Sequence, residues 1–176
     1  MSEKLPSRKE ALIFLNKVGC SKEVINHCMA VARLALKIAM NIQDNGVKVN
    51  LPLIEIGATL HDVGRSITHT VDHAVIGAEI AKKAGLHASV ISIINRHVGG
   101  GITRDEAKKL GWKKGIYMPF TIEEKIVSVA DKLIEKSKRA PIENAIQKLI
   151  EEKKIAASNR VRKLYDEIIT LAGDIS

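Results

Sequence analysis

The chain has 176 residues, of which 45% are apolar and 27% charged, so it is long enough for one domain with a sizeable core and too short for two full ones. No apolar run approaches the roughly 18 residues of a membrane span, and the first six residues lack the hydrophobic segment of a signal peptide, so we expect a cytoplasmic protein without a membrane partner. The formal net charge of +8 favours anionic partners such as nucleotides or RNA, and equally fits a composition suited to high temperature.

Helix signals dominate the sequence, and strand signals are nearly absent. Ser7 and Glu10 form a capping box for the first helix, which we expect to end at Gly19. Four further helices are expected next in the chain, over residues 21–44, 50–62, 72–84 and 88–97. Two more are expected to begin at capping boxes, one of Thr103 with Glu106 and one of Thr121 with Glu124. The last two are expected over residues 141–154 and 159–172. The pattern predicts an all-α bundle of about seven to nine helices, without internal repeats.

Six ionisable side chains occupy positions where the buried stripes of these helices should carry apolar residues. Burying one imidazole or carboxylate costs several kcal/mol unless the group is paired. Groups of this kind on five helical segments are therefore expected to satisfy one another around a metal. Imidazole with carboxylate suits Mn²⁺, Fe²⁺, Co²⁺, Ni²⁺ or Zn²⁺ rather than Mg²⁺ or Ca²⁺. The six residues are His27, His61, Asp62, His73, His97 and Asp131.

The order of these six residues and their local contexts resemble the HD superfamily of metal-dependent phosphohydrolases. The contexts are "HCMAVARLA", "GATLHDVGR", "HAVIGAEIAKK", "RHVGGGI" and "EEKIVSVADKLIE", and the resemblance covers about residues 21–137. The resemblance implies a single HD-type domain over residues 1–176 with its core at 21–137. Residues 138–176, which carry no candidate ligand, are expected to form a C-terminal helical hairpin packed on that core, with Arg160, Arg162 and Lys163 on a solvated face.

The resemblance also implies how the ligands divide. A minimal site of the family would consist of His27, His61, Asp62 and Asp131, whereas His73 and His97 match the extra pair that binuclear members use for a second metal. Asp62 would then bridge two ions and act as a catalytic residue, and a hydroxide between the ions would be the nucleophile. We therefore expect one or two divalent transition-metal ions.

The activity implied is hydrolysis of a phosphate ester or anhydride in a phosphorylated small molecule, with a nucleotide as the favoured substrate. Arg65 follows the "HDVG" turn, where its guanidinium would hold a non-bridging phosphate oxygen and assist catalysis. Arg96 and Lys132 each flank a candidate ligand and are further candidates for substrate binding. Nucleic acid is a less favoured partner because aromatic residues are scarce, and a homo-oligomer is compatible with the sequence.

Two other functions remain open at this point. Some proteins that resemble the same six-residue set are di-iron oxygenases, such as myo-inositol oxygenase, and a small HD module could also bind or sense a nucleotide or RNA without turnover. Basic residues around the candidate ligands favour a phosphorylated substrate. The cyclic-dinucleotide branch of the superfamily carries a Gly-Tyr-Pro signature, and this chain has Ile116-Tyr117-Met118-Pro119 instead, which counts against that branch.

The remaining motifs have two interpretations each. The segment 110–120 holds three of the five aromatic residues, and it would be either a lid over a nucleobase or a loop pinned by its own side chains. Gly99–Gly101 would either let the backbone approach a ligand or simply end a helix. His69 and His87 fall outside the ligand pattern, and we expect both to be surface residues.

Overall fold

The computed structural model describes residues 5–175. The expectation about the first six residues falls partly on residues 1–4, and the expected domain extends to residue 176; these five residues lie outside the described range. Within it the chain folds into nine α-helices, which confirms the all-α class. They are α1 (Arg8–Lys17), α2 (Lys22–Asp44), α3 (Leu51–Leu60), α4 (His73–Lys83), α5 (Ala88–Arg96), α6 (Arg104–Lys109), α7 (Ile122–Lys132), α8 (Ile142–Glu151) and α9 (Ile155–Ala172). None of the helices in this range has the length and apolar character needed to cross a bilayer.

The helix starts follow local capping chemistry. All three expected capping boxes are formed: Ser7 with Glu10, Thr103 with Glu106, and Thr121 with Glu124. The start expected for the last helix is wrong, because α9 begins at Ile155 and not at residue 159. Lys153, with φ of 58°, reverses the chain after α8 so tightly that the next helix begins two residues later.

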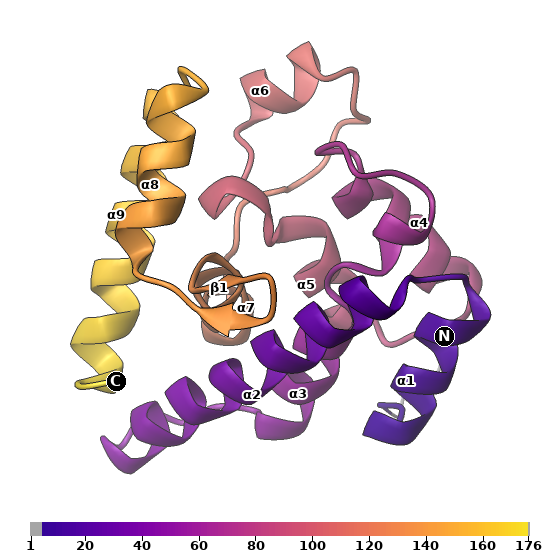
Figure 1. Ribbon diagram of the computed structural model, residues 1–176, viewed down its shortest axis with the longest axis horizontal. Helices are drawn as coiled ribbons and strands as arrows, with labels where there is room; N and C mark the ends of the chain where they lie inside the picture. Colours follow the sequence, from indigo (N-terminus) through magenta and orange to yellow (C-terminus); the bar gives the residue numbers. More distant parts are fainter. Residues whose placement is uncertain (1–4, 176) are drawn as a thin grey trace.

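The core is built around α2, the longest helix. Figure 1 shows α2 crossing the molecule beside α3, and it also packs against α7 and α9. Ile38 and Ile42 of α2 and Ile54 of α3 are fully buried in this core, as are Ile93 and Ile126 of neighbouring helices. Two polar side chains, His61 and His97, are equally buried, and they mark the position of the candidate site inside the bundle.

Short elements join the helices near this site. Two 3₁₀ turns, η1 (Val63–Ser66) and η2 (Val98–Gly100), follow α3 and α5. A two-stranded antiparallel hairpin, β1 (Ile134–Glu135) and β2 (Lys138–Arg139), follows α7 and packs against α2. This hairpin could not be predicted from the sequence, because strands of two residues have too little periodicity to be recognised.

The C-terminal helices α8 and α9 lie side by side at one flank of the molecule (Figure 1), and α9 contacts α7, η2 and α2. The expectation that Arg160 belongs to a solvated face is wrong, because this half-buried side chain donates to both carboxylate oxygens of Glu106 at 2.8 and 2.9 Å. This ion pair ties α9 to α6. The boundary near residue 137 between core and hairpin stays a prediction.

Candidate metal centre

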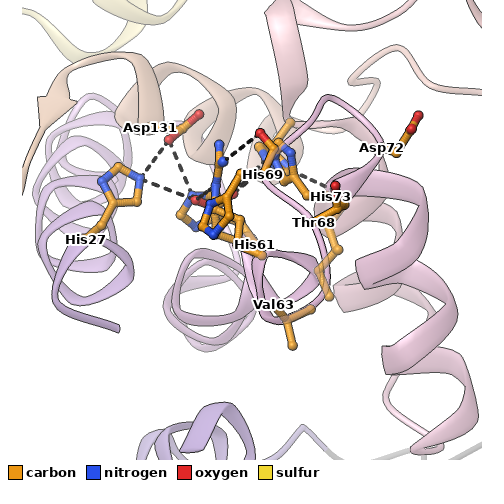
Figure 2. A network of polar contacts seen from close by, with 12 residues as sticks. His27, His61, Val63, Thr68, His69, Asp72, His73 and Asp131 are labelled. Atoms are coloured by element: carbon orange, nitrogen blue, oxygen red, sulfur yellow. Dashed lines mark hydrogen bonds and ion pairs between the residues drawn. The ribbon is translucent and has the colours of Figure 1, made fainter. Parts of the chain in front are cut away.

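All six expected ligands converge on one point inside the bundle. Each comes from a helix or from the residues directly after one: His27 from α2, His61 and Asp62 after α3, His73 from the first turn of α4, His97 after α5, and Asp131 from the last turn of α7. Figure 2 shows His27, His61 and Asp131 pointing toward one another, with His73 on the opposite side. The helical spacing that predicted these positions therefore agrees with the inward orientation of these side chains in the structure.

One group of ligands gathers around Asp131. Its Oδ1 lies 3.0 Å from Nε2 of His27 and 3.3 Å from Nε2 of His61. Oδ2 of Asp62 faces the same two nitrogens, at 3.8 Å from His27 and 3.7 Å from His61. Ligand atoms this close can share a single metal ion, and His27, His61 and Asp131 offer one such set.

A second group uses the other oxygen of Asp62. Its Oδ1 lies 3.1 Å from Nε2 of His73 and 3.5 Å from Nε2 of His97, and these two nitrogens are 3.0 Å apart. Asp62 thus presents one carboxylate oxygen to each group. This is the arrangement required of a carboxylate that bridges two metal ions.

Backbone carbonyls fix the orientation of three of the four histidines. In His61, His73 and His97, Nδ1 lies 2.7 Å from the carbonyl oxygen of the residue three positions earlier. A carbonyl can only accept, so each Nδ1 carries the hydrogen and each neutral ring directs the lone pair of Nε2 toward the centre. Hydrogen bonds of this kind hold metal-ligating histidines in position and make them more basic ligands.

Two buried atoms of the centre lack partners. Among the described residues, Nε2 of His61 and Oδ1 of Asp62 have no hydrogen bond, although both are enclosed by protein. An unsatisfied buried polar atom costs about 1–3 kcal/mol, so its presence requires an explanation. A divalent cation among these donors would satisfy both atoms, and imidazole with carboxylate suits Mn, Fe, Co, Ni or Zn. The donor set therefore fits a transition metal.

Electrostatics keep the carboxylates ionised. Burial disfavours the charge of Asp62, but the positive charge of His61 and the contacts with His73 and His97 hold the pKa of Asp62 well below its usual range. Burial of Asp131 is likewise outweighed by Lys132, which contacts its Oδ2, so the pKa of Asp131 is also well below its usual range. Both groups are ready to bind a cation at neutral pH.

The two most buried histidines differ in basicity. Burial opposes protonation of His61, but the charge of Asp62 more than compensates and raises the pKa of His61 well above its ordinary value. Burial dominates at His97 and lowers its pKa to about 4. In the absence of a cation, His61 thus carries the proton that balances the carboxylates, whereas His97 stays neutral.

Arg65 lies at the opening of the centre. Its Nε donates to Oδ2 of Asp62 at 2.6 Å, and one terminal nitrogen lies 3.5 Å from the carbonyl oxygen of His69. A cavity of about 290 Å³ opens here, and His27, Asp62, Arg65 and His69 are among its lining residues. A guanidinium beside the ligands at the floor of a cavity can orient Asp62 and meet an anionic group that enters.

The other candidates are placed differently. Arg96 forms an ion pair with the buried carboxylate of Glu124, donating to its two oxygens at 2.8 and 3.1 Å, so a partner within the fold accounts for its charge. His69 is exposed at the cavity, as expected for a surface residue. His87 is half-buried, and its Nδ1 accepts a hydrogen bond from the amide of Ser89, so it caps α5 and is not a free surface residue.

The segment 110–120 is anchored at two of its three aromatic residues. Nε1 of Trp112 donates to Oδ1 of Asp72 at 2.7 Å, and Tyr117 is buried against the Trp112 ring. Phe120, in contrast, is 80% exposed. These contacts agree with the interpretation of a loop pinned by its own side chains, and they link the loop to the residue before His73.

Some contributors were not found from the sequence. Ser128 is fully buried, and its hydroxyl donates to the carbonyl oxygen of His97 at 2.9 Å, which fixes the end of α5 against α7. Lys136, at the tip of the hairpin, lines the cavity over the candidate centre. Neither residue has a sequence signal of its own, because a serine in a helix and a lysine in a charged run are common.

Comparison with known proteins agrees with this geometry. The HD domain family model matches residues 24–136. A protein of Methanocaldococcus jannaschii named only as uncharacterized is 41% identical over 93% of this chain and 97% of its own length. A tRNA (cytidine(56)-2'-O)-methyltransferase of Picrophilus torridus is 34% identical over 96% of this chain, and a ribonuclease Y of Thermosipho melanesiensis is 32% identical over 81%. The chain spans only 48% and 25% of the length of these two relatives.

Among solved structures, the HD domain of the phosphodiesterase PgpH of L. monocytogenes, crystallised with cyclic-di-AMP, superimposes with a TM-score of 0.56. The alignment covers 92% of this chain and 98% of that one, at 20% sequence identity. At this level of identity the likeness concerns the fold alone. It agrees with the helical bundle described above.

Proposed function

Since this chain belongs to the HD domain family, we propose that it is a metal-dependent phosphohydrolase that cleaves a phosphate ester or anhydride, with a nucleotide as substrate. One observation carries the proposal: the two carboxylate oxygens of Asp62 face two separate histidine pairs. Three of these four histidines are oriented toward the centre by backbone carbonyls. Such a set of donors suits two metal ions that share one carboxylate.

The candidate ligands and Arg65 would have different roles. His27, His61 and Asp131 would hold one ion, His73 and His97 the other, and Asp62 would contact both. Bound divalent metals supply Lewis acidity and lower the pKa of water, which makes a nucleophile available at neutral pH. Arg65 holds Oδ2 of Asp62 and lies at the cavity, so its guanidinium would orient this carboxylate and stabilise negative charge on a phosphate.

Lys132 also contributes to the candidate metal centre, through its contact with Asp131. Its ammonium group contacts Oδ2 of Asp131 and keeps that carboxylate ionised, so we propose a role in charge balance with a secondary role in substrate binding. Arg96 forms an ion pair with Glu124, so we do not propose it as a contact for the substrate. These assignments leave Arg65 as the main cationic contact for the reacting phosphate.

The relatives support a nucleotide or a nucleotide-containing polymer as substrate. Ribonuclease Y and the tRNA methyltransferase are both named for RNA, and the PgpH domain was crystallised with a cyclic dinucleotide. This chain lacks the Gly-Tyr-Pro signature of the cyclic-dinucleotide branch, which favours a linear phosphate ester. The activities of the longer relatives also depend on parts of those proteins that this chain does not match.

The proposal is tested by metal analysis and by a substrate screen. Protein purified without chelator is analysed for metal content, and a panel of phosphate esters and anhydrides is then assayed with Mn²⁺, Co²⁺, Ni²⁺ and Zn²⁺. We expect one to two ions per chain and metal-dependent release of phosphate or nucleotide. A metal content far below one ion per chain, with no turnover in any metal, would contradict the proposal.

A binding module without turnover is the second candidate, favoured by the match to half of a tRNA methyltransferase. The same panel separates the two functions. Tight nucleotide or RNA binding by a metal-loaded protein that hydrolyses none of the esters would favour the module. Oxygen consumption with a polyol or phosphonate would favour the oxygenase that shares this type of ligand set.

A further inference from the structure

A second cavity adjoins the one over the metal centre. It measures about 540 Å³ and is lined by Glu23, Asn26, Met29 and Arg33 of α2 together with Lys136 and Ser137 of the hairpin turn. Glu23 and Lys136 also line the cavity over the metal centre. The two hollows therefore meet at these two residues. A ligand larger than one phosphate group could extend from the first cavity into the second.

The floor of the second cavity is one face of α2. Its residues follow a spacing of three or four, from Glu23 through Asn26 and Met29 to Arg33, so they lie in one stripe along the helix. His27 stands beside this stripe. Arg33 is six residues beyond His27, which is about 9 Å along the helix axis at 1.5 Å per residue. Since stacked nucleotides rise about 3.4 Å per step, this corresponds to about two or three nucleotides.

The hairpin turn supplies the opposite wall. Lys136 and Ser137 are the two central residues of a two-residue loop, with Glu135 paired to Lys138 across it, and their φ values are 44° and 67°. Such turns favour Asn and Gly, because positive φ is unfavourable for other residues. Here a lysine occupies the strained position and lines both cavities. Backbone strain of this kind is found most often where the side chain has a function.

The charges around the two cavities favour an anion. Arg33 on α2 and Lys136 on the hairpin are exposed cations of the second cavity, and Lys136 and Arg65 line the first. Glu23, where the two cavities meet, carries the opposite charge. It lies in the first turn of α2, where the positive end of the helix dipole offsets part of its negative charge. Apart from Glu23, the candidate ligand Asp62 and the histidines, the acidic and basic side chains that line the two cavities are the cations Arg65, Lys136 and Arg33.

We propose that Arg33 and Lys136 form a second phosphate subsite and that the substrate is a linear oligonucleotide. The phosphate at the cleaved bond would lie at the metal centre, and a phosphate about two or three nucleotides away would lie between Arg33 and Lys136. This inference rests on the proposed function of the centre. It makes the hairpin turn a determinant of specificity, which distinguishes a nucleotide chain from a simple phosphate ester.

The experiment compares two substrates, a short single-stranded oligoribonucleotide and bis-p-nitrophenyl phosphate, which has a single phosphate. The variants are Arg33→Ala, Lys136→Ala and Lys136→Arg, and Lys138→Ala is the control, because Lys138 is exposed on the same hairpin but lines neither cavity. For each alanine variant at the subsite, kcat/KM on the oligonucleotide should fall about ten-fold more than on the small ester, the scale of one lost charge-assisted hydrogen bond. Lys136→Arg should retain most of the activity.

Two further measurements sharpen the test. Each subsite variant should reduce the salt dependence of oligonucleotide binding by about one charge. Glu23→Gln should act in the opposite direction and lower KM for the oligonucleotide, because it removes the carboxylate at the junction. Equal losses on both substrates, or a loss in Lys138→Ala as large as in Lys136→Ala, would overturn the subsite.

Failure of the proposed function can be told apart from failure of the subsite. If the wild-type protein hydrolyses neither substrate in any metal, binding of a fluorescently labelled oligonucleotide is measured by anisotropy instead. Weaker binding by the Arg33→Ala/Lys136→Ala double variant, with Lys138→Ala unchanged, would support the subsite even then. Unchanged affinity of the double variant would refute it.

Discussion

Nε2 of His73 and Nε2 of His97 lie 3.0 Å apart, and both rings donate their Nδ1 hydrogen to a backbone carbonyl. In the neutral state, each nitrogen therefore points a lone pair at the other. Two lone pairs at this distance repel unless a proton or a cation lies between or beside them. Because His97 resists protonation, a metal ion is the better solution, and the carbonyl groups of Thr70, before α4, and of Ile94, in α5, hold the pair ready for it.

The first prediction distinguishes one ion from two. Asp62→Ala removes an oxygen from both groups of ligands, so metal content and turnover should be lost together. His97→Ala touches only the second group and should leave about one ion per chain, with turnover reduced by about 10²–10³-fold, as for other losses of charge stabilisation. Metal counts by mass spectrometry and initial rates are the measurements. Asp105→Ala, an exposed carboxylate on α6, is the control. A His97→Ala protein with the metal content of the wild type would indicate a mononuclear site.

The second prediction concerns pH. Without metal, the raised pKa of His61 means that this side chain is protonated at neutral pH, and it must lose that proton when Nε2 binds an ion. Metal affinity should therefore increase with pH until the raised pKa of His61 is passed. His97, with a pKa of about 4, contributes nothing in this range. Calorimetric titrations with Mn²⁺ in buffers of different ionisation enthalpy measure the protons released. Binding without proton release at pH 7 would contradict this protonation state.

The third prediction explains the glycine of the "HDVG" motif. A methyl group at Gly64 would overlap the carbonyl oxygen of His73 and lie 2.7 Å from the amide nitrogen of Gly77. Gly64→Ala should therefore displace the first turn of α4, lower the free energy of unfolding by about 1–3 kcal/mol and reduce metal content. Gly57→Ala is the comparison variant, because its methyl group would lie 2.4 Å from Cδ1 and 3.1 Å from Cγ2 of the Ile93 side chain, whereas the methyl group at Gly64 would meet backbone atoms next to a candidate ligand. Denaturant unfolding and metal analysis of both variants make the comparison, and equal effects would exclude a special role for Gly64.

The fourth prediction separates stability from substrate binding at Arg96. Arg96→Ala would leave the buried carboxylate of Glu124 without its cation, although the backbone amide of Phe120 still donates to it at 2.6 Å. The free energy of unfolding should fall by about 1–3 kcal/mol. KM and metal content should not change, because the guanidinium is engaged away from the ligands. A large increase in KM with unaltered stability would restore the role in substrate binding that the sequence suggested.

Much of the fold and of the metal centre could be predicted because it depends on short-range patterns. Capping boxes act over four residues, and the buried stripe of a helix repeats every three or four, so His27 and Asp131 were recognisable as polar groups on apolar faces. The partners of Arg96 and Arg160 could not be predicted in this way. Glu124 and Glu106 lie 28 and 54 residues away in the chain, and only the packing of whole helices brings them together.

At two points the local sequence preferences did not predict the structure. Lys136 and Ser137 form a turn whose backbone favours Asn and Gly, so the sequence carries no turn signal there. At α9 the helix begins without a side-chain cap, after a lysine with positive φ, so the start was placed at residue 159 and not at Ile155. In both cases tertiary packing outweighs the local preference. The turn that escaped recognition is also the one that borders both cavities.

The hydrogen bond between Trp112 and Asp72 gives the protein an optical reporter. Trp112 is the single tryptophan of the chain, and its indole nitrogen donates a hydrogen bond to Asp72, the residue that precedes His73. A rearrangement of the first turn of α4 when an ion binds would change the surroundings of this indole. The emission spectrum of the unlabelled protein would then follow the occupancy of the second ligand group in real time, with no label and no substrate.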